Sequence, residues 1–343
     1  MSKRPHWQRV ASTLFAMLVL ALVVVLPILR DQHGTEVTRY RNALLAERGK
    51  AGDFDWTPAN WPADFQREHA PVPSALQQWH GLQQPANLNV WSRTLLLAKA
   101  LTGRPRKGNM IAKPTLQTLQ IIERSGAGYC ADYTKVLNAL GYAADIPVRQ
   151  WSFSFDGFGG WGHTFNEIWD EAAQRWRMID VFNGFYPRDA NSGEGLSALE
   201  FRQRLLQSPQ SILWERLEAG RFGFHDDAEA LTYFRNGANE WYLWWGNDPL
   251  SYDSNAVVAF AARFGRLPEQ VAGLLTGAMP GFKMLVTEDN ADTVAAVGRL
   301  KAFLLGAALI ELMLFGVLLW QLLAWRKSWR RSQHKLLQDS QVS

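Results

Sequence analysis

Two long apolar segments constrain this chain more than any other feature. Residues 10–29 are apolar except for Ser12, Thr13 and Pro27, and residues 302–325 are apolar except for a few polar positions. An α-helix rises 1.5 Å per residue, so about 20 apolar residues cross a hydrocarbon core of about 30 Å. The sequence therefore predicts two transmembrane helices with a large extramembrane region between them.

The first segment reads as an uncleaved anchor. Lys3, Arg4 and Arg9 precede it, and it ends in the letters LPILRDQHG. A cleavable signal peptide has a shorter apolar core followed by a small-residue cleavage site. Removal as a signal peptide is the alternative.

The charge distribution predicts how the chain is oriented. There are 36 Lys and Arg against 32 Asp and Glu, but the basic excess belongs to residues 1–9 and 326–343, while residues 30–300 are mildly acidic. Basic flanks stay on the cytoplasmic side. We therefore expect cytoplasmic termini and, in a bacterium, an inner-membrane protein whose central region faces the periplasm. The acidic middle argues against nucleic acid as a partner.

Glu311 lies inside the second apolar segment. An ionisable group in a bilayer is costly and often functional. The alternative is a protonated carboxyl, or one hydrogen-bonded to the first helix, and the sequence does not choose between these.

The extramembrane region divides into three parts by composition. Residues 30–109 are rich in Pro, Trp and turn residues and predict a helical and irregular lead-in. Residues 110–190 carry the clearest periodicity and predict the core domain. Residues 191–300 predict a mainly helical extension.

Within 110–190 the patterns predict a helix followed by three strands. A glycine-rich turn leads to Cys130, and apolar residues then recur at helical spacing. Residues 148–155, 163–169 and 176–181 alternate as strands do, and the last two fit a hairpin. The predicted fold class is α+β, with extra helices and two flanking transmembrane helices.

Cys130, His163 and Asp180 are the candidate catalytic residues on this layout. A helix N-terminus offers unpaired N–H groups and a partial positive charge, which favour thiolate and suit an oxyanion. The start of one antiparallel strand lies beside the end of the next, so His163 and Asp180 are expected to meet. Nucleophile, base and orienting carboxylate are the parts of covalent acyl transfer.

Four blocks resemble the transglutaminase-like superfamily with its papain-like Cys-His-Asp core. In order, they read Gly128-Tyr129-Cys130, then Ala139-Leu140-Gly141 with Ile146-Pro147-Val148-Arg149, then His163-Thr164-Phe165-Asn166-Glu167, then Trp176 with Asp180. The resemblance implies a cysteine-bearing helix on an antiparallel sheet, with Cys130 as nucleophile, His163 as base and Asp180 as orienter. Acyl transfer through these residues needs no metal or organic cofactor. Thr-Phe-Asn after His163 and Val-Phe-Asn-Gly after Asp180 depart from the family pattern and leave the substrate class open.

Trp91 and Tyr129 are secondary candidates for an oxyanion or cleft position, with core packing as the alternative for Trp91. Glu167 is expected to partner Arg149 structurally. Other features are expected to be structural or solvent-exposed: His69, His80 and His225, the basic loop of Arg104, Arg106, Lys107 and Lys113, and the aromatic cluster at 233–245. No zinc or calcium spacing is apparent.

The function predicted first is an extracytoplasmic cysteine acyl-transfer enzyme acting on amide bonds. The expected substrate is a protein, peptide or peptidoglycan-type amide, and either water or an amine takes the acyl group. The second hypothesis is an inert scaffold in a cell-envelope or exported-polysaccharide assembly. A transporter component is a third reading, which would make Glu311 the residue to test.

Overall fold

The structure is a computed structural model that describes residues 6–31, 35–85, 87–109, 111, 113–218 and 221–339. It forms two compact units. The first joins Met1–Tyr40 with Gly298–Ser343, and the second comprises Arg41–Val297.

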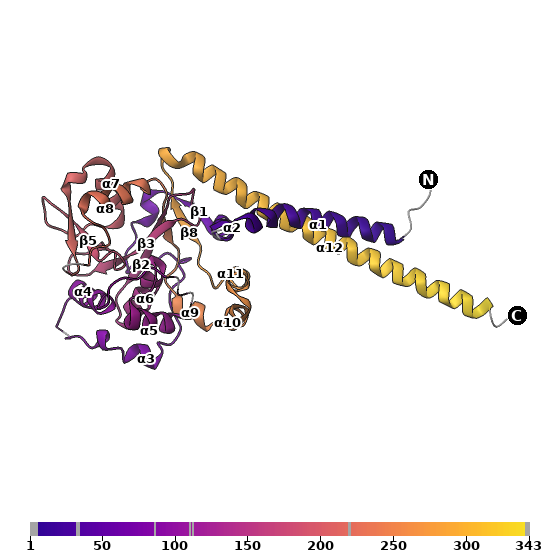
Figure 1. The fold of residues 1–343 in the computed structure, drawn as a ribbon, viewed down its shortest axis with the longest axis horizontal. Coiled ribbons are helices and arrows are strands. Elements are labelled where there is room, and N and C mark those ends of the chain that lie inside the picture. The colour runs from indigo at the N-terminus through magenta and orange to yellow at the C-terminus, as the bar shows by residue number, and fades with distance from the viewer. Residues whose placement is uncertain are drawn as a thin grey trace. The chain divides into compact units, whose positions relative to one another are not determined.

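The first unit holds the two long apolar helices. Helices α1 (His6–Arg30) and α12 (Ala291–Asp339) each contain a stretch long and apolar enough to cross a membrane, as predicted. They run antiparallel within the unit (Figure 1), and the Gln321 amide donates to the Thr13 hydroxyl at 3.1 Å. A cavity of about 420 Å³ between them is lined by apolar side chains and Glu311. One carboxyl oxygen of Glu311 is buried and has no hydrogen-bond partner among the described residues.

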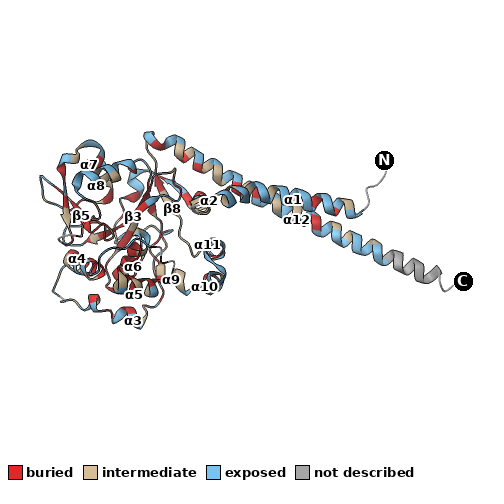
Figure 2. Cartoon of the chain, viewed as in Figure 1, coloured by how far each residue is buried: buried red, intermediate tan, exposed pale blue. Residues whose placement is uncertain are grey.

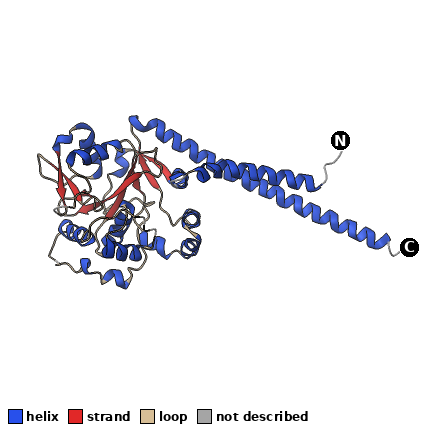
Figure 3. Ribbon diagram, viewed as in Figure 1, coloured by secondary structure: helices blue, strands red, loops and turns tan. Residues whose placement is uncertain are grey.

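The second unit is built on a six-stranded sheet that is mostly antiparallel (Figure 3). Only the β1–β8 pair is parallel. In spatial order the strands are β1 (Ala46–Gly49), β8 (Phe282–Leu285), β7 (Trp241–Trp244), β2 (Val148–Ser154), β3 (Gly162–Asp170) and β4 (Arg175–Ile179). The three strands expected from alternation are thus confirmed as β2, β3 and β4, and the α+β class is confirmed with them.

Helices cover both faces of this sheet (Figure 1). One layer holds α4 (Val90–Leu101), α5 (Thr115–Ser125) and α6 (Cys130–Ala143), and α7 (Ala198–Gln207) and α8 (Asp227–Asn236) lie on the other face. An aliphatic core fills the first layer and a largely aromatic core fills the second. The strands between them are mostly buried (Figure 2).

The other elements are short or peripheral. They are α2 (Thr35–Leu45), α3 (Ser74–Gln77), α9 (Pro249–Ser254), α10 (Ala256–Ala261), α11 (Arg266–Leu275), the two-stranded sheet of β5 (Phe185–Asp189) and β6 (Ile212–Arg216), and the 3₁₀ turns η1 (Ala51–Phe54), η2 (His80–Leu82), η3 (Pro209–Ser211), η4 (Ala262–Phe264) and η5 (Glu288–Asn290).

Residues 191–300 are mainly helical, as predicted, but this stretch also supplies the short strands β6, β7 and β8. Strand β7 reads Trp-Tyr-Leu-Trp and lies between β8 and β2. A central strand buried on both faces is a short apolar run without alternation, and periodicity does not distinguish it from a buried helix. The lead-in likewise contributes the four-residue strand β1.

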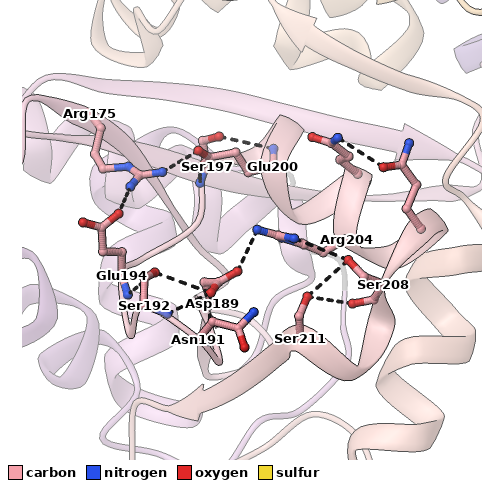
Figure 4. Close-up of polar contacts among 12 residues, drawn as sticks. Arg175, Asp189, Asn191, Ser192, Glu194, Ser197, Glu200, Arg204, Ser208 and Ser211 are labelled. Carbon is pink, nitrogen blue, oxygen red and sulfur yellow. Dashed lines mark hydrogen bonds and ion pairs between the residues drawn. The ribbon is translucent and has the colours of Figure 1, made fainter.

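Polar contacts tie together the segments on either side of residue 190 (Figure 4). From β4, Arg175 donates to Glu194 and to Glu200 of α7, both at 2.5 Å. Asp189 at the end of β5 pairs with Arg204 of α7 at 2.8 Å. Helix α7 and the small sheet therefore belong to the same unit as the main sheet.

A buried ion pair fixes neighbouring strands of the sheet. Arg149 of β2 donates from Nε to Glu167 of β3 at 2.5 Å, and both side chains are buried. Glu167 also accepts from the Trp151 ring N–H and from the backbone of Ala198, at 2.5 Å each. The predicted Arg149–Glu167 partnership is confirmed, and its extra hydrogen bonds satisfy charges that would otherwise be costly to bury.

Candidate functional site

Cys130 is the first residue of α6, as predicted. Gly126, with φ of +68°, ends α5, and Gly128, with φ of +129°, directs the chain into α6. The backbone N–H of Tyr129 donates to the carboxylate of Asp132 at 2.9 Å, which caps the new helix. Cys130 as a whole is partly exposed and lies at the positive end of the helix.

His163 and Asp180 meet where β3 begins and β4 ends. His163 is the second residue of β3, and Asp180 directly follows Ile179, the last residue of β4. The Nε2 atom of His163 lies 2.7 Å from Oδ2 of Asp180, and both side chains are buried. The expected imidazole–carboxylate contact is therefore present.

Asp180 and Cys130 both act electrostatically on the imidazole of His163. Burial alone would lower the pKa of His163, but the charges of Asp180 and Cys130, together with the hydrogen bond to Asp180, outweigh it and raise the pKa from 6.5 to about 10. This environment favours imidazolium, the form that accompanies a thiolate.

Asn183 supports the carboxylate and was not identified from the sequence. Its side-chain amide donates to Oδ2 of Asp180 at 2.8 Å, and its backbone N–H donates to Oδ1 at 3.0 Å. The same amide nitrogen lies 3.3 Å from Nε2 of His163. Both oxygens of Asp180 are thus held by one residue of the tight turn that joins β4 to β5.

Arg106 holds Asn183 in turn. Its guanidinium donates to the side-chain oxygen of Asn183 at 2.7 Å and to the carbonyl of Gly223 at 3.0 Å, and lies 4.6 Å from the ring centre of Phe182. The basic loop was expected to be solvated, and Arg106 is exposed as expected, but its contact with the Asn183 turn was not predicted. The reason is tertiary, because a loop 77 residues earlier in the chain reaches the Asn183 turn.

Gly223 leaves the space in which this contact forms. A Cβ atom at this position would lie 2.2 Å from Oδ1 of Asn183 and 2.7 Å from Nη1 of Arg106. Any larger residue therefore has to displace one of those two side chains.

Aromatic rings from the opposite layer enclose the imidazole. Tyr233 and Phe234 of α8 meet the His163 ring edge-on, with centroids 5.8 and 5.7 Å apart. Burial, together with the charges of Cys130 and Asp180, raises the pKa of Tyr233, which keeps its hydroxyl protonated. The expectation that the 233–245 cluster packs in the core is confirmed at Phe234 and Trp241, while Tyr233 extends the cluster to the site.

The two secondary candidates lie in different surroundings. Trp91 is buried in the first layer, where the Arg177 guanidinium lies 3.8 Å from the ring centre and the Tyr186 ring is 5.3 Å away. These contacts fit the alternative that Trp91 packs in the core. Tyr129 is exposed and adjoins Cys130, which is the location that a cleft residue requires.

The other histidines singled out from the sequence have separate surroundings. His80 and His225 are exposed beside Glu123 and Asp226, and His69 contacts Ser251. Among the described residues, no group of three or more His, Cys, Asp or Glu side chains is arranged to hold a metal ion.

Comparison of the chain with protein-family models, curated proteins and solved structures gives no match. The transglutaminase-like resemblance therefore rests on the four sequence blocks.

Proposed function

We propose that this protein is a membrane-anchored cysteine acyl-transfer enzyme with a transglutaminase-like, papain-like core. Cys130 is the nucleophile, His163 the acid and base, and Asp180 the orienting carboxylate. The observation that carries the proposal is the 2.7 Å contact between His163 and Asp180, on an imidazole whose pKa is also influenced by a cysteine at a helix N-terminus.

The proposed reaction begins with proton transfer from the Cys130 thiol to His163. The raised pKa of His163, which reflects stabilisation of the imidazolium beside Asp180, favours this transfer. The thiolate sulfur attacks the carbonyl carbon of an amide. N–H groups of the first turn of α6 stabilise the oxyanion.

Collapse of this tetrahedral intermediate breaks the C–N bond while His163 gives its proton to the leaving amine. A thioester on Cys130 remains. Water or a second amine then attacks the thioester carbonyl, His163 takes the proton of the attacking group, and the thiolate leaves. Water gives a peptidase or amidase, and an amine gives a transamidase.

Arg106 and Asn183 act as positioning residues in this proposal. Asn183 donates to both oxygens of Asp180, so the carboxylate presents Oδ2 to the imidazole in one orientation. Arg106 fixes the direction of the Asn183 amide. The turn sequence that departs from the family pattern thus takes part in the proposed site.

Thiol reactivity tests the proposal directly, because Cys130 is the one cysteine in the chain. We expect rapid alkylation of the full-length protein by iodoacetamide at pH 6, where an isolated thiol is almost entirely protonated. His163→Ala should remove this reactivity. His225→Ala, which changes an exposed histidine, should retain it.

Slow alkylation that is the same in all three proteins would contradict the proposal and favour the scaffold hypothesis. If the thiol is activated, primary-amine probes with acyl donors would distinguish transamidation from hydrolysis.

We also propose the two-pass topology with both termini in the cytoplasm and Cys130 on the other side, in a bacterium the periplasm. It is supported by the basic flanks of the two apolar segments. A membrane-impermeant maleimide should then label Cys130 in spheroplasts. Labelling confined to inverted vesicles would give the opposite orientation.

A further inference from the structure

Helices α10 and α11, joined through η4, direct large apolar side chains outward. We call this set the α10–α11 face, and its members are Val257, Phe260, Phe264, Leu267, Val271 and Leu275. Leu275 is 83% exposed and Phe264 is 69% exposed. A helix on a water-facing surface normally turns such residues toward the core. Helices α10 and α11 instead expose these side chains.

The inward side of the same helices carries mostly smaller groups, together with the polar side chain of Gln270. Val258, Ala272 and Gly273 are buried, and a Cβ atom at Gly273 would lie 3.1 Å from the ring of Tyr252. The small residues thus permit close packing against α9, while the larger side chains remain outside. The rings of Phe260 and Phe264 lie 5.3 Å apart, which makes the outer surface continuous across the two helices. A grouped apolar surface of this kind marks contact with another apolar phase.

The lipid bilayer is the apolar phase that the two long apolar helices of this chain would hold close to the α10–α11 face. Both ends of the second unit continue into helices that are long and apolar enough to cross a membrane. The first of these helices ends at Arg30 and the second unit begins at Arg41, and a chain of that length extends at most about 40 Å. This short connection would keep the α10–α11 face close to the lipid surface, so its effective local concentration of lipid is high.

The charges beside the face fit lipid phosphates. Arg263 and Arg266 are exposed at the junction of the two helices, and Glu269 is the one acid between residues 256 and 275. Glu269 is partnered, because it accepts from Tyr252 at 3.1 Å and from Arg266 at 3.3 Å. A second copy of the chain, packed by a two-fold axis, would bring the same arginines toward each other. A bilayer surface instead presents phosphates to them.

We propose that the α10–α11 face inserts into the surface of the bilayer that carries α1 and α12. Its apolar side chains enter the boundary of the acyl chains, and Arg263 and Arg266 bind lipid phosphates. The second unit is then held at the membrane by three elements, and this inference is independent of the chemistry proposed for Cys130.

Lipid quenching in the full-length chain tests the inference. In a Cys130→Ser background, Phe264→Cys and Leu275→Cys are each labelled with an environment-sensitive fluorophore and reconstituted into vesicles of phosphatidylcholine and phosphatidylglycerol. Leu213→Cys is the matched control, because Leu213 is also an exposed apolar residue but lies on β6. We expect lipids with a nitroxide on the acyl chain to remove most of the emission at 264 and 275 but not at 213.

A charge reversal separates lipid contact from protein contact. Arg263→Glu should weaken the dependence of quenching on phosphatidylglycerol by at least about fivefold, because loss of one basic residue at an anionic surface alone has an effect of that size. Arg124→Glu on α5 should leave it unchanged. Absence of quenching at both 264 and 275 would overturn the inference. Emission changes that disappear when labelled protein is diluted with unlabelled protein would instead identify a second copy as the occupant and would also overturn it.

Discussion

Replacement of Asp180 by Asn tests the electrostatic basis of the candidate site. The side chain keeps its shape but loses the negative charge that lies 2.7 Å from Nε2 of His163. A hydrogen bond to a charged group contributes about 1.5–3 kcal/mol, which corresponds to a change in pKa of about 1–2. We therefore expect the pKa of His163 to fall from about 10 by that amount.

The pKa of His163 also predicts how stability depends on pH. Because it is raised in the folded protein, its contribution is fully present below pH 6.5 and is lost as the pH rises through about 10. The difference corresponds to about 5 kcal/mol at most. Asp180→Asn should reduce this loss between pH 6.5 and 10, because folded and unfolded imidazole would then titrate closer together.

Ring nitrogen NMR of the full-length protein in detergent micelles measures this pKa directly. The chain has seven histidines, and His163→Gln assigns the relevant signal. Asp226→Asn is the control, because it removes a carboxylate from the exposed pair with His225 and should leave His163 unchanged. A His163 signal that titrates near 6.5 in the unmodified protein, or one that Asp180→Asn does not move, would refute the charged-pair reasoning.

Two further predictions concern single contacts. Gly223→Ala should change thermal stability little, because the new methyl group meets the ends of two flexible side chains, but it should displace Asn183 and slow alkylation of the thiol. Gly52→Ala is the control, because a Cβ atom at that position would have no neighbouring atom within 4 Å. Equal alkylation rates in the two variants would contradict a role for Asn183. In a Cys130→Ser background, Thr13→Cys with Gln321→Cys should crosslink readily in membranes, since these side chains are hydrogen-bonded between α1 and α12. The measurement is a mobility shift under oxidising conditions, and its absence would argue against the antiparallel pairing.

The candidate site was predictable where local patterns determine it. A glycine turn before an apolar helical repeat placed Cys130 at a helix N-terminus, and two alternating segments placed His163 and Asp180 at adjacent strand ends. These features follow from backbone periodicity and need only short stretches of sequence. Trp91, in contrast, was a candidate because some members of the resembled family use an aromatic side chain upstream of the cysteine, and its buried position beside Arg177 gives it structural contacts.

By itself, the sequence determined the two apolar helices, the helix and three strands around the candidate triad, and the Arg149–Glu167 pair. Only the tertiary structure decided that Arg106 reaches Asn183, that Tyr233 meets His163 and that β7 lies between β8 and β2. The first group depends on helical or strand periodicity and on the length of apolar runs, which neighbouring residues encode. The second depends on which surfaces pack together across many residues of chain, and packing is a property of the whole fold.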